Sequence, residues 1–151
     1  MALIDDDDFD DISRFKWRIA GRGYAIRDVS RKDNPEGIKE YMHRRIISAR
    51  LGEQVDHINM NKLDNRKRNL RIATASENAA HKGMQSNNTI GFKGVSYRSS
   101  ERIYIAKSEI MGRHIHIGRF KNPIAAARAY DDFIVKTFGE FAVTNKSLGL
   151  L

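Results

Sequence analysis

The chain has 151 residues, which is room for one ordinary domain or two small ones but not for a large multi-part enzyme. Its composition, 40% hydrophobic and 30% charged, is typical of soluble globular proteins, and no apolar run approaches the roughly 20 residues that span a bilayer, so we expect no membrane insertion. The absence of cysteine excludes disulfides and cysteine-ligated zinc, and no signal-peptide pattern opens the chain, so we expect an intracellular setting.

The excess of basic residues indicates a polyanionic partner. Lys and Arg number 27 and Asp and Glu 19, giving a net charge of +8, and the sequence pI is near 9.9. Six of the acidic residues lie together in the run DDDDFDD at residues 5–11, and setting those six aside raises the net charge of the remainder from +8 to +14. Such a surplus favours nucleic acid, whose phosphates bind Lys and Arg largely through counterion release. Basic charge that only serves solubility is the alternative.

The first elements in chain order are an acidic tail, a β-hairpin and a helix. We interpret residues 1–12 as a solvated, frayed tail, with shielding of the basic surface or metal binding as alternatives. The stretch FKWRIAGRGYAIRDVS, residues 15–30, alternates apolar and polar residues around the turn signal GRG and predicts a hairpin. After a loop at KDNPEG, residues 32–37, the spacing in IKEYMHRRIISARLG, residues 38–52, predicts a helix, although its β-branched residues also allow a partly extended conformation.

The next stretch, from residue 53 to residue 81, predicts two strands, a loop and a helix. EQVDHI is a strand that ends in polar residues, NMNKLDNRKRN is a loop held by Asn and Asp side-chain turns, and LRIAT is the second strand. The helix starts at a capping box in which Thr74 caps and Glu77 reaches back. Asn78 and His81 lie three residues apart and therefore on one face of that helix.

This order of elements could bring four polar side chains together: Asp56, His57, Asn78 and His81. Such a group suits phosphodiester hydrolysis. Asp56 and the amide oxygen of Asn78 could hold a hard cation that neutralises phosphate charge. His57, with an ordinary pKa of about 6.5, could take the proton of the attacking water. Spacing alone leaves open that these residues only make local hydrogen bonds.

The segment MHRRIISARLGEQVDHINMNKLDNRKRNLRIATASENAAH, residues 42–81, resembles the HNH endonuclease family, in the branch of free-standing phage and intron-encoded homing endonucleases. The motifs VDHIN, LDNR, NLR and SEN occur in the order of that family. The resemblance implies a ββα-metal fold in which His57 is the general base and Asp56 and Asn78 bind the divalent cation. It also implies that Asn69 pins the loop by hydrogen bonds to its backbone, that cleavage leaves 5′-phosphate and 3′-hydroxyl ends, and that the enzyme works in the cytoplasm of a bacterial host.

Several further residues lie in or around this motif. Because Asn78 stands where a toxin branch of the family has histidine, the ligands are oxygens, which favour Mg²⁺ or Mn²⁺ over Zn²⁺. His81 could be an auxiliary ligand, a phosphate contact or a helix-surface residue, and we favour the last two. We interpret His43 as packing beside the motif. Arg66 and Arg71 are expected to clamp phosphate.

The C-terminal part predicts a small sheet covered by one helix. GMQSNNTIG lacks periodicity and predicts a linker at residues 83–90. FKGVSYRSS, RIYIAKSEI and RHIHIGRF predict three antiparallel strands, and NPIAAARAYDDFIVKTFG predicts a helix that starts at Asn122 and Pro123. Basic residues in and around the strands predict a cationic face on the side away from the helix: Lys93, Arg98, Arg102, Lys107, Arg113, Arg119 and Lys121.

Residues 91–145 resemble the ethylene-response-factor (Apetala-two) DNA-binding domain, through the motifs GVSYR, IGRF, AAARAYD and FGEFAVTN. The resemblance implies that the sheet lies in the major groove of double-stranded DNA. The residues expected to contact DNA are the following: Lys93, Arg98, Arg102, Tyr104, Lys107 and Arg113. Tyr104 stands where plant members usually have tryptophan.

The sequence therefore predicts an α+β chain, with an HNH module at residues 13–82, the linker, a DNA-reading module at residues 91–145 and a C-terminal tail at residues 146–151. We expect a metal-dependent DNA endonuclease. A non-cleaving DNA-binding regulator is the main alternative, and an RNA-cleaving or toxin-like nuclease is a weaker one. The sequence leaves open the recognition site, nicking versus double-strand cleavage, and the oligomeric state.

Overall fold

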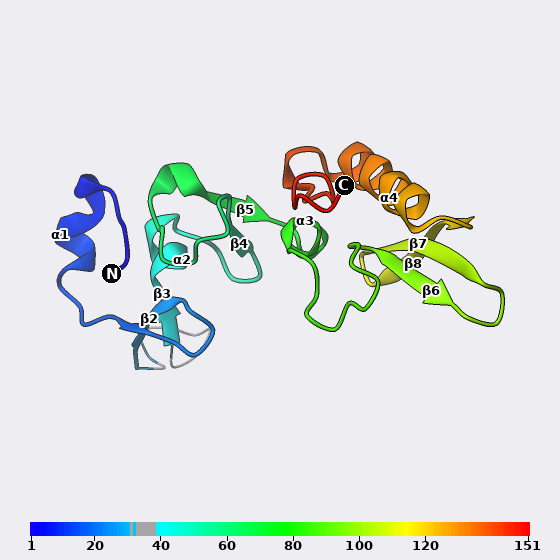
Figure 1. Ribbon diagram of the computed structural model, residues 1–151. Helices are drawn as coiled ribbons and strands as arrows, with labels where there is room; N and C mark the ends of the chain where they lie inside the picture. Colours follow the sequence, from blue (N-terminus) through cyan, green and yellow to red (C-terminus); the bar gives the residue numbers. More distant parts are fainter. Residues whose placement is uncertain (31, 33–38) are drawn as a thin grey trace. The chain divides into compact units, whose positions relative to one another are not determined.

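The computed structural model describes residues 1–30, 32 and 39–151 (Figure 1). It combines short helices with small antiparallel sheets, in agreement with the predicted α+β class. The chain divides into two compact units, Met1–Thr74 and Ala75–Leu151, each with its own core. No helix of the described residues is long and apolar enough to cross a membrane. Apart from Lys32, the predicted loop at residues 32–37 lies outside the described residues, as does Ile38.

The first unit begins with a three-stranded antiparallel sheet. Its strands are β1 (Arg18–Ile19), β2 (Ala25–Asp28) and β3 (Lys39–Tyr41). The predicted hairpin at residues 15–30 is confirmed, because β1 and β2 pair around the GRG turn. The helix predicted at residues 38–52 is much shorter than its apolar spacing suggested. Lys39–Tyr41 pairs with β2, and only Met42–Ile46 is helical (α2), since Ser48 takes a φ of +51° that ends the right-handed helix.

The acidic N-terminal segment is folded, so the expectation of a frayed tail is wrong. A 3-10 turn at Asp6–Asp8 (η1) leads into the short helix Phe9–Ile12 (α1), and Ile12 is buried in the core of the unit. The negative charge is held by partners of opposite sign. Asp11 accepts two hydrogen bonds from the Arg45 guanidinium, both of 2.6 Å.

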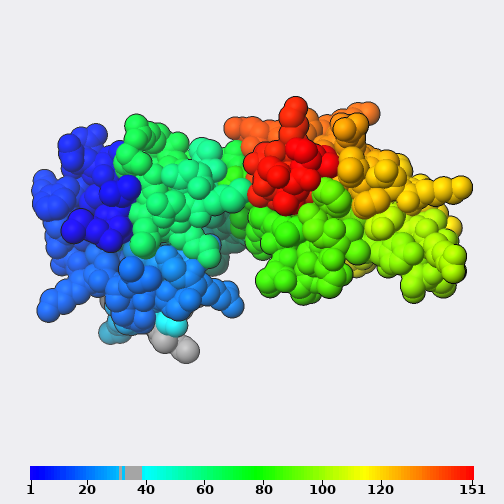
Figure 2. Space-filling model, in the orientation of Figure 1, coloured from blue at the N-terminus to red at the C-terminus, as the bar shows by residue number. Residues whose placement is uncertain are grey.

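The same segment also adds backbone contacts. Leu3 forms an isolated parallel bridge with Asp64, in which the Leu3 N–H donates to the Leu63 carbonyl (2.7 Å) and the Asn65 N–H donates to the Leu3 carbonyl (2.8 Å). In Figure 2 the dark blue N-terminal residues lie against the loop that follows β4. The first residues of the chain are therefore an integral part of this unit.

The two predicted strands of the central motif are confirmed. They pair antiparallel as β4 (Gln54–His57) and β5 (Leu70–Ala73), with Asp56 directly opposite Arg71. A 3-10 turn at Lys67–Asn69 (η2) leads into β5. The buried core of this unit consists of Ile12, Ala25, Met42, Ile46 and Leu70. Both sheets and the N-terminal segment contribute to this core, which holds β4 and the loop in place.

The second unit is a three-stranded sheet with a helix across one face (Figure 1). Its elements are α3 (Ala75–His81), β6 (Val95–Arg98), β7 (Ile103–Ile110), β8 (Arg113–Phe120), α4 (Pro123–Phe138) and η3 (Gly139–Phe141). All three predicted strands and the long helix are confirmed. Asn122 caps α4 as expected, since its side-chain oxygen accepts from the Ile124 N–H (2.8 Å) and the Ala125 N–H (3.4 Å).

Small residues let α4 approach the sheet closely. Ala126 and Ala127 are fully buried, and Ile134 and Tyr130 fill the rest of the interface. Gly94 has a φ of +74°, and a Cβ there would lie 2.0 Å from the Tyr130 ring, so no larger residue fits this position without a shift of the ring.

The expected linker at residues 83–90 is not where the structure divides. The helix α3 belongs to the second unit, where the Ala80 carbonyl accepts from the Val143 N–H (3.3 Å) and from the Lys93 ammonium (2.6 Å). The segment after α3 is an ordered loop, in which the Asn88 side-chain oxygen accepts from the N–H groups of Ile90 (2.9 Å) and Gly91 (2.8 Å). Its polar composition reflects these side-chain turns and not a flexible connection.

Candidate active site

The centre of the candidate site lies at the end of β4, where Asp56 and His57 are both 5% exposed. Asp56 forms a cross-strand ion pair with Arg71, whose Nε and Nη2 each lie 2.9 Å from the Asp56 Oδ2. Burying a carboxylate is costly unless it is paired and hydrogen-bonded, and Arg71 supplies that pairing in the first unit.

Hydrogen bonding decides which nitrogen of His57 carries the proton. The His57 Nε2 lies 3.2 Å from the side-chain oxygen of Asn65, a residue with no exposed surface. The Asn65 amide nitrogen donates to the Leu63 carbonyl (3.3 Å) and to the Met42 sulfur (3.5 Å), so its oxygen is the atom that faces the ring. A carbonyl oxygen can only accept, and therefore Nε2 carries the proton and Nδ1 keeps its lone pair.

Aromatic rings keep His57 in a water-poor environment. The buried His43 packs edge-on against it, with ring centroids 5.0 Å apart and an interplanar angle of 74°. Tyr24 packs beside both imidazoles, 5.2 Å from His43 and 6.0 Å from His57. Burial lowers the pKa of His43 to about 3 and also holds the pKa of His57 below its ordinary value. Both rings are therefore neutral near pH 7, and His43 has the packing role expected for it.

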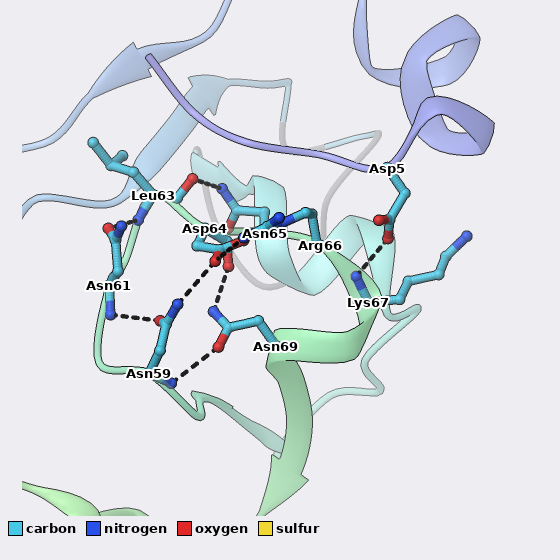
Figure 3. Close-up of polar contacts among 9 residues, drawn as sticks. All are labelled: Asp5, Asn59, Asn61, Leu63, Asp64, Asn65, Arg66, Lys67 and Asn69. Carbon is cyan, nitrogen blue, oxygen red and sulfur yellow. Dashed lines mark hydrogen bonds and ion pairs between the residues drawn. The ribbon is translucent and has the colours of Figure 1, made fainter.

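The loop between β4 and β5 is held by its own amide side chains, as its composition predicted (Figure 3). The Asn59 side chain accepts from the Asn61 N–H (2.9 Å), and the Asn61 side chain accepts from the Leu63 N–H (3.1 Å). Asn69 reaches into the same loop. Its amide nitrogen donates to the Asp64 carbonyl (2.7 Å), and its oxygen accepts from the Asn59 N–H (2.9 Å). These are contacts of the kind that the resemblance implied for Asn69.

Two basic residues of this loop, Arg66 and Lys67, are engaged by carboxylates. Arg66 donates to both oxygens of the buried Asp64 (2.7 and 2.6 Å), and this pairing holds the pKa of Asp64 well below its usual range. Lys67 contacts the N-terminal segment twice, because its N–H donates to the Asp5 carboxylate (2.7 Å, Figure 3) and its ammonium lies 2.7 Å from Asp8. Arg66, expected to clamp phosphate, therefore has a structural partner within the loop.

Asn78 and His81 both lie on α3, in the second unit. His81 is only 8% exposed, which does not fit its interpretation as a helix-surface residue. Within the described residues, no three His, Cys, Asp or Glu side chains lie close enough to hold a metal ion. A cation at Asp56 would need amide, water or substrate oxygens as its other ligands.

The structure corrects two of the expected DNA contacts in the second unit. Lys93 is 8% exposed, and its ammonium donates to the carbonyls of Ala80 (2.6 Å) and Val143 (2.9 Å), so it anchors α3 and cannot reach phosphate. Tyr104 packs against the core between sheet and α4, because it lies on the same face of β7 as the buried Ala106. Lys93 is therefore not available to DNA, and Tyr104 lies on the face that α4 covers.

The face of the sheet away from α4 retains basic residues. Strand alternation and the register place three of them there: Arg98, Lys107 and Arg119. Arg98 and Arg119 both bind Glu101 (2.6 and 3.1 Å). Arg102 is exposed in the turn before β7, with a φ of +54°, whereas Arg113 pairs with Ile110 and alternates onto the opposite face from Lys107. This face of the sheet therefore carries Arg119 beside Arg98 and Lys107, which were expected to contact DNA.

Two functional features of the first unit escaped sequence reasoning. Asn65 fixes the His57 tautomer, and the motif LDNR was the available signal, but its letters do not say which side chain turns inward. The pairing of Arg71 with Asp56 was hidden because strand register, and not sequence distance, places them opposite each other.

Comparison with known proteins places this chain among the nucleases. A family model described as HNH endonuclease matches residues 40–80, from β3 to the last turn of α3. An uncharacterized HNH endonuclease of Acanthamoeba polyphaga mimivirus is 31% identical over 149 residues, covering 97% of this chain and 75% of the viral protein. No solved structure matches the chain. The chain belongs to the HNH endonuclease family and is a DNA-cleaving enzyme.

Proposed function

We propose that this HNH endonuclease is a metal-dependent, homing-type enzyme that hydrolyses phosphodiester bonds in double-stranded DNA with a water activated by His57. The observation that carries this proposal is the hydrogen bond between His57 Nε2 and Asn65, which leaves the Nδ1 lone pair as the base.

The surroundings of His57 suit a general base. A base must be unprotonated before it can accept the proton of water, and burial keeps the pKa of His57 low, so the ring is neutral at physiological pH. Its packing against His43 and its bond to Asn65 restrict rotation of the ring. The imidazole is thus preorganised, and little conformational entropy is lost when it meets the attacking water.

Asp56 and Asn78 are the proposed ligands of a Mg²⁺ or Mn²⁺ ion, and Asn69 holds the loop that follows β4. A single buried carboxylate at the end of β4 fits such an ion, because Mg²⁺ is commonly bound by one or two carboxylates together with waters and substrate phosphate oxygens. The cation would neutralise charge that develops on the phosphate and on the departing 3′ oxygen. The absence of cysteine and the oxygen character of the ligands make Zn²⁺ the weaker candidate.

The second unit is proposed to bind DNA as an Apetala-two type domain, through the sheet face that carries Arg98, Lys107 and Arg119. That face is supported by the register of β6, β7 and β8, and α4 covers the other one. His114 and His116 alternate onto the same side. Glu101, which holds two of the arginines, would have to share them with phosphate.

A plasmid assay tests the proposal. Supercoiled DNA is incubated with the protein and Mg²⁺, Mn²⁺ or EDTA, and nicked and linear products are separated on a gel. Cleavage that needs the cation and is lost in His57→Ala supports the mechanism. Binding without cleavage under every condition would instead favour the alternative of a DNA-binding regulator. Linear product without a nicked intermediate would indicate that two chains act together, because one site per chain cuts one strand at a time.

A further inference from the structure

The ion pair between Asp56 and Arg71 lies at the centre of the candidate active site. It lies across the β4–β5 ladder, directly beside His57, and both side chains are shielded, with exposed fractions of 6% for Asp56 and 13% for Arg71. The guanidinium Nε and Nη2 each lie 2.9 Å from the same carboxylate oxygen, Oδ2. The positive charge of Arg71 therefore lies beside the Asp56 carboxylate, to which a divalent cation would bind.

A second pair in the same unit shows what a structural arginine does here. Arg66 contacts both oxygens of Asp64, which also accepts from the Asn59 amide (2.8 Å), so that carboxylate is saturated by the loop. Asp64 has no part in the proposed chemistry. A divalent ion bound to Asp56, the proposed metal ligand, would be repelled by the Arg71 guanidinium, because two positive charges near one carboxylate repel each other strongly where water is scarce.

We propose that Arg71 is an exchangeable counter-ion of Asp56: it neutralises the carboxylate when no metal is bound, competes with the divalent cation, and is released toward DNA phosphate when the cation binds. This inference rests on the proposed role of Asp56 as a metal ligand. Arg71 is in these terms a positioning residue, which acts through Asp56 before any chemistry begins.

The exchange couples cation binding to DNA binding. A guanidinium released from Asp56 keeps five N–H donors in a fork that matches phosphate oxygens. A phosphate close by would therefore stabilise the released state, and DNA would raise the affinity for the cation. By linkage, the cation would raise the affinity for DNA by the same factor. An enzyme built this way holds its metal weakly until a substrate is present.

Mn²⁺ binding in the absence of DNA gives a readout that does not depend on activity. Mn²⁺ is titrated into the full chain and the unbound ion is followed by electron paramagnetic resonance. Arg71→Met should bind Mn²⁺ about tenfold more tightly than wild type, a factor typical of coupled sites, whereas Arg71→Lys should stay close to wild type because the charge is kept. Asp56→Asn should abolish binding. Arg18→Met is the matched control, since it removes an exposed arginine paired with Asp28 from the same unit and should change nothing.

The second measurement repeats the titration with sonicated duplex DNA, in the His57→Ala background so that the DNA is not cut. In the His57→Ala protein, where Asp56 and Arg71 are intact, DNA should raise the Mn²⁺ affinity about tenfold. This gain should vanish when Arg71→Met is added. Should Arg71→Met fail to fold by circular dichroism, Arg71→Gln serves in its place. Weaker or unchanged Mn²⁺ binding in the folded variant would overturn the inference, as would an equal gain from DNA in both proteins. Because the first titration contains no DNA, its outcome is separate from whether the wild-type enzyme cleaves.

Discussion

The Nε2 of His57 lies 3.2 Å from the side-chain oxygen of Asn65, and this contact decides which nitrogen of the ring can act as a base. Asn65→Leu should lower the cleavage rate about tenfold or more, as loss of an orienting partner commonly does, because the ring then populates both tautomers. DNA affinity should stay unchanged. Asn65→Asp keeps an acceptor and should recover part of the rate, while its negative charge raises the pKa of His57.

Single-turnover cleavage rates across pH separate orientation from folding. In Asn65→Asp the acidic limb of the profile should move to higher pH, a change that a merely structural residue would not cause. Equal rates for the wild type and Asn65→Leu would remove Asn65 from this role.

His57→Ala should lower cleavage by a factor on the order of 10² to 10⁴, the usual contribution of a general base, with DNA binding unaffected. The wild-type pH profile gives a further check. The active form of His57 is neutral, and burial holds its pKa below 6.5, so the rate should remain high down to that pH and fall only below it. Cleavage that is half-maximal well above pH 7 would contradict the assignment, as would a variant within tenfold of wild type.

Removal of residues 1–4 should loosen the loop that supports the site. It deletes the two backbone hydrogen bonds of Leu3 and the apolar contacts of Ala2 and Ile4 with the core. The cost in the free energy of unfolding should be about 2–4 kcal/mol. Hydrogen exchange gives the local readout, because the Asn65 amide loses its acceptor on Leu3. Unchanged protection of that amide, beside unchanged stability in urea, would show that the segment is dispensable.

Lys93 makes stability depend on pH in a defined window. Burial lowers its pKa to about 8, against 10.5 for the ordinary group, so between these values the unfolded chain binds a proton that the folded chain does not. The free energy of unfolding should therefore rise with pH over that window, by up to about 3 kcal/mol, and Lys93→Met should remove the rise. The comparison is best made from pH 8 to 10, because the pKa of Tyr130 is raised to about 12 and its ionisation opposes the trend above pH 10. Urea midpoints that change equally with pH in the wild type and in Lys93→Met would refute the assignment of this pH dependence to Lys93.

The sheet face of the second unit should carry most of its DNA affinity. Arg98→Ala and Arg119→Ala should each cost about 1–3 kcal/mol if they contact bases, or lower the salt slope by about one if they contact phosphate. Arg128→Ala is the matched control, because it removes the same charge from the exposed side of α4. Gel-shift titrations at two salt concentrations give both quantities. An equal loss of DNA affinity in Arg128→Ala and Arg119→Ala would show that DNA does not bind at this face of the sheet.

Local patterns were sufficient for most of the secondary structure. Period-two alternation and turn residues act between neighbours in the chain, so the hairpin, β4, β5 and the C-terminal sheet could be read from sequence. The same holds for the Asn59 and Asn61 turns, whose hydrogen bonds span two residues. Asp56, His57 and Asn69 stood out because a known motif contains them. Helical spacing failed at residues 39–41 because pairing with β2 outweighed a weak local preference.

The environment of each charged side chain was decided by tertiary structure. Lys93 looked like a DNA contact, yet its acceptors are 13 and 50 residues away in the chain. The acidic N-terminal segment was expected to be solvated, but Asp11 accepts a hydrogen bond from Arg45, 34 residues further along the chain. The pairing of Asp56 with Arg71 follows from strand register. The sequence determined which residues carry charge and which motif they belong to. The tertiary structure decided which charged side chains are buried and which residues they pair with. Burial and pairing depend on segments that are distant in the sequence and that only folding brings together.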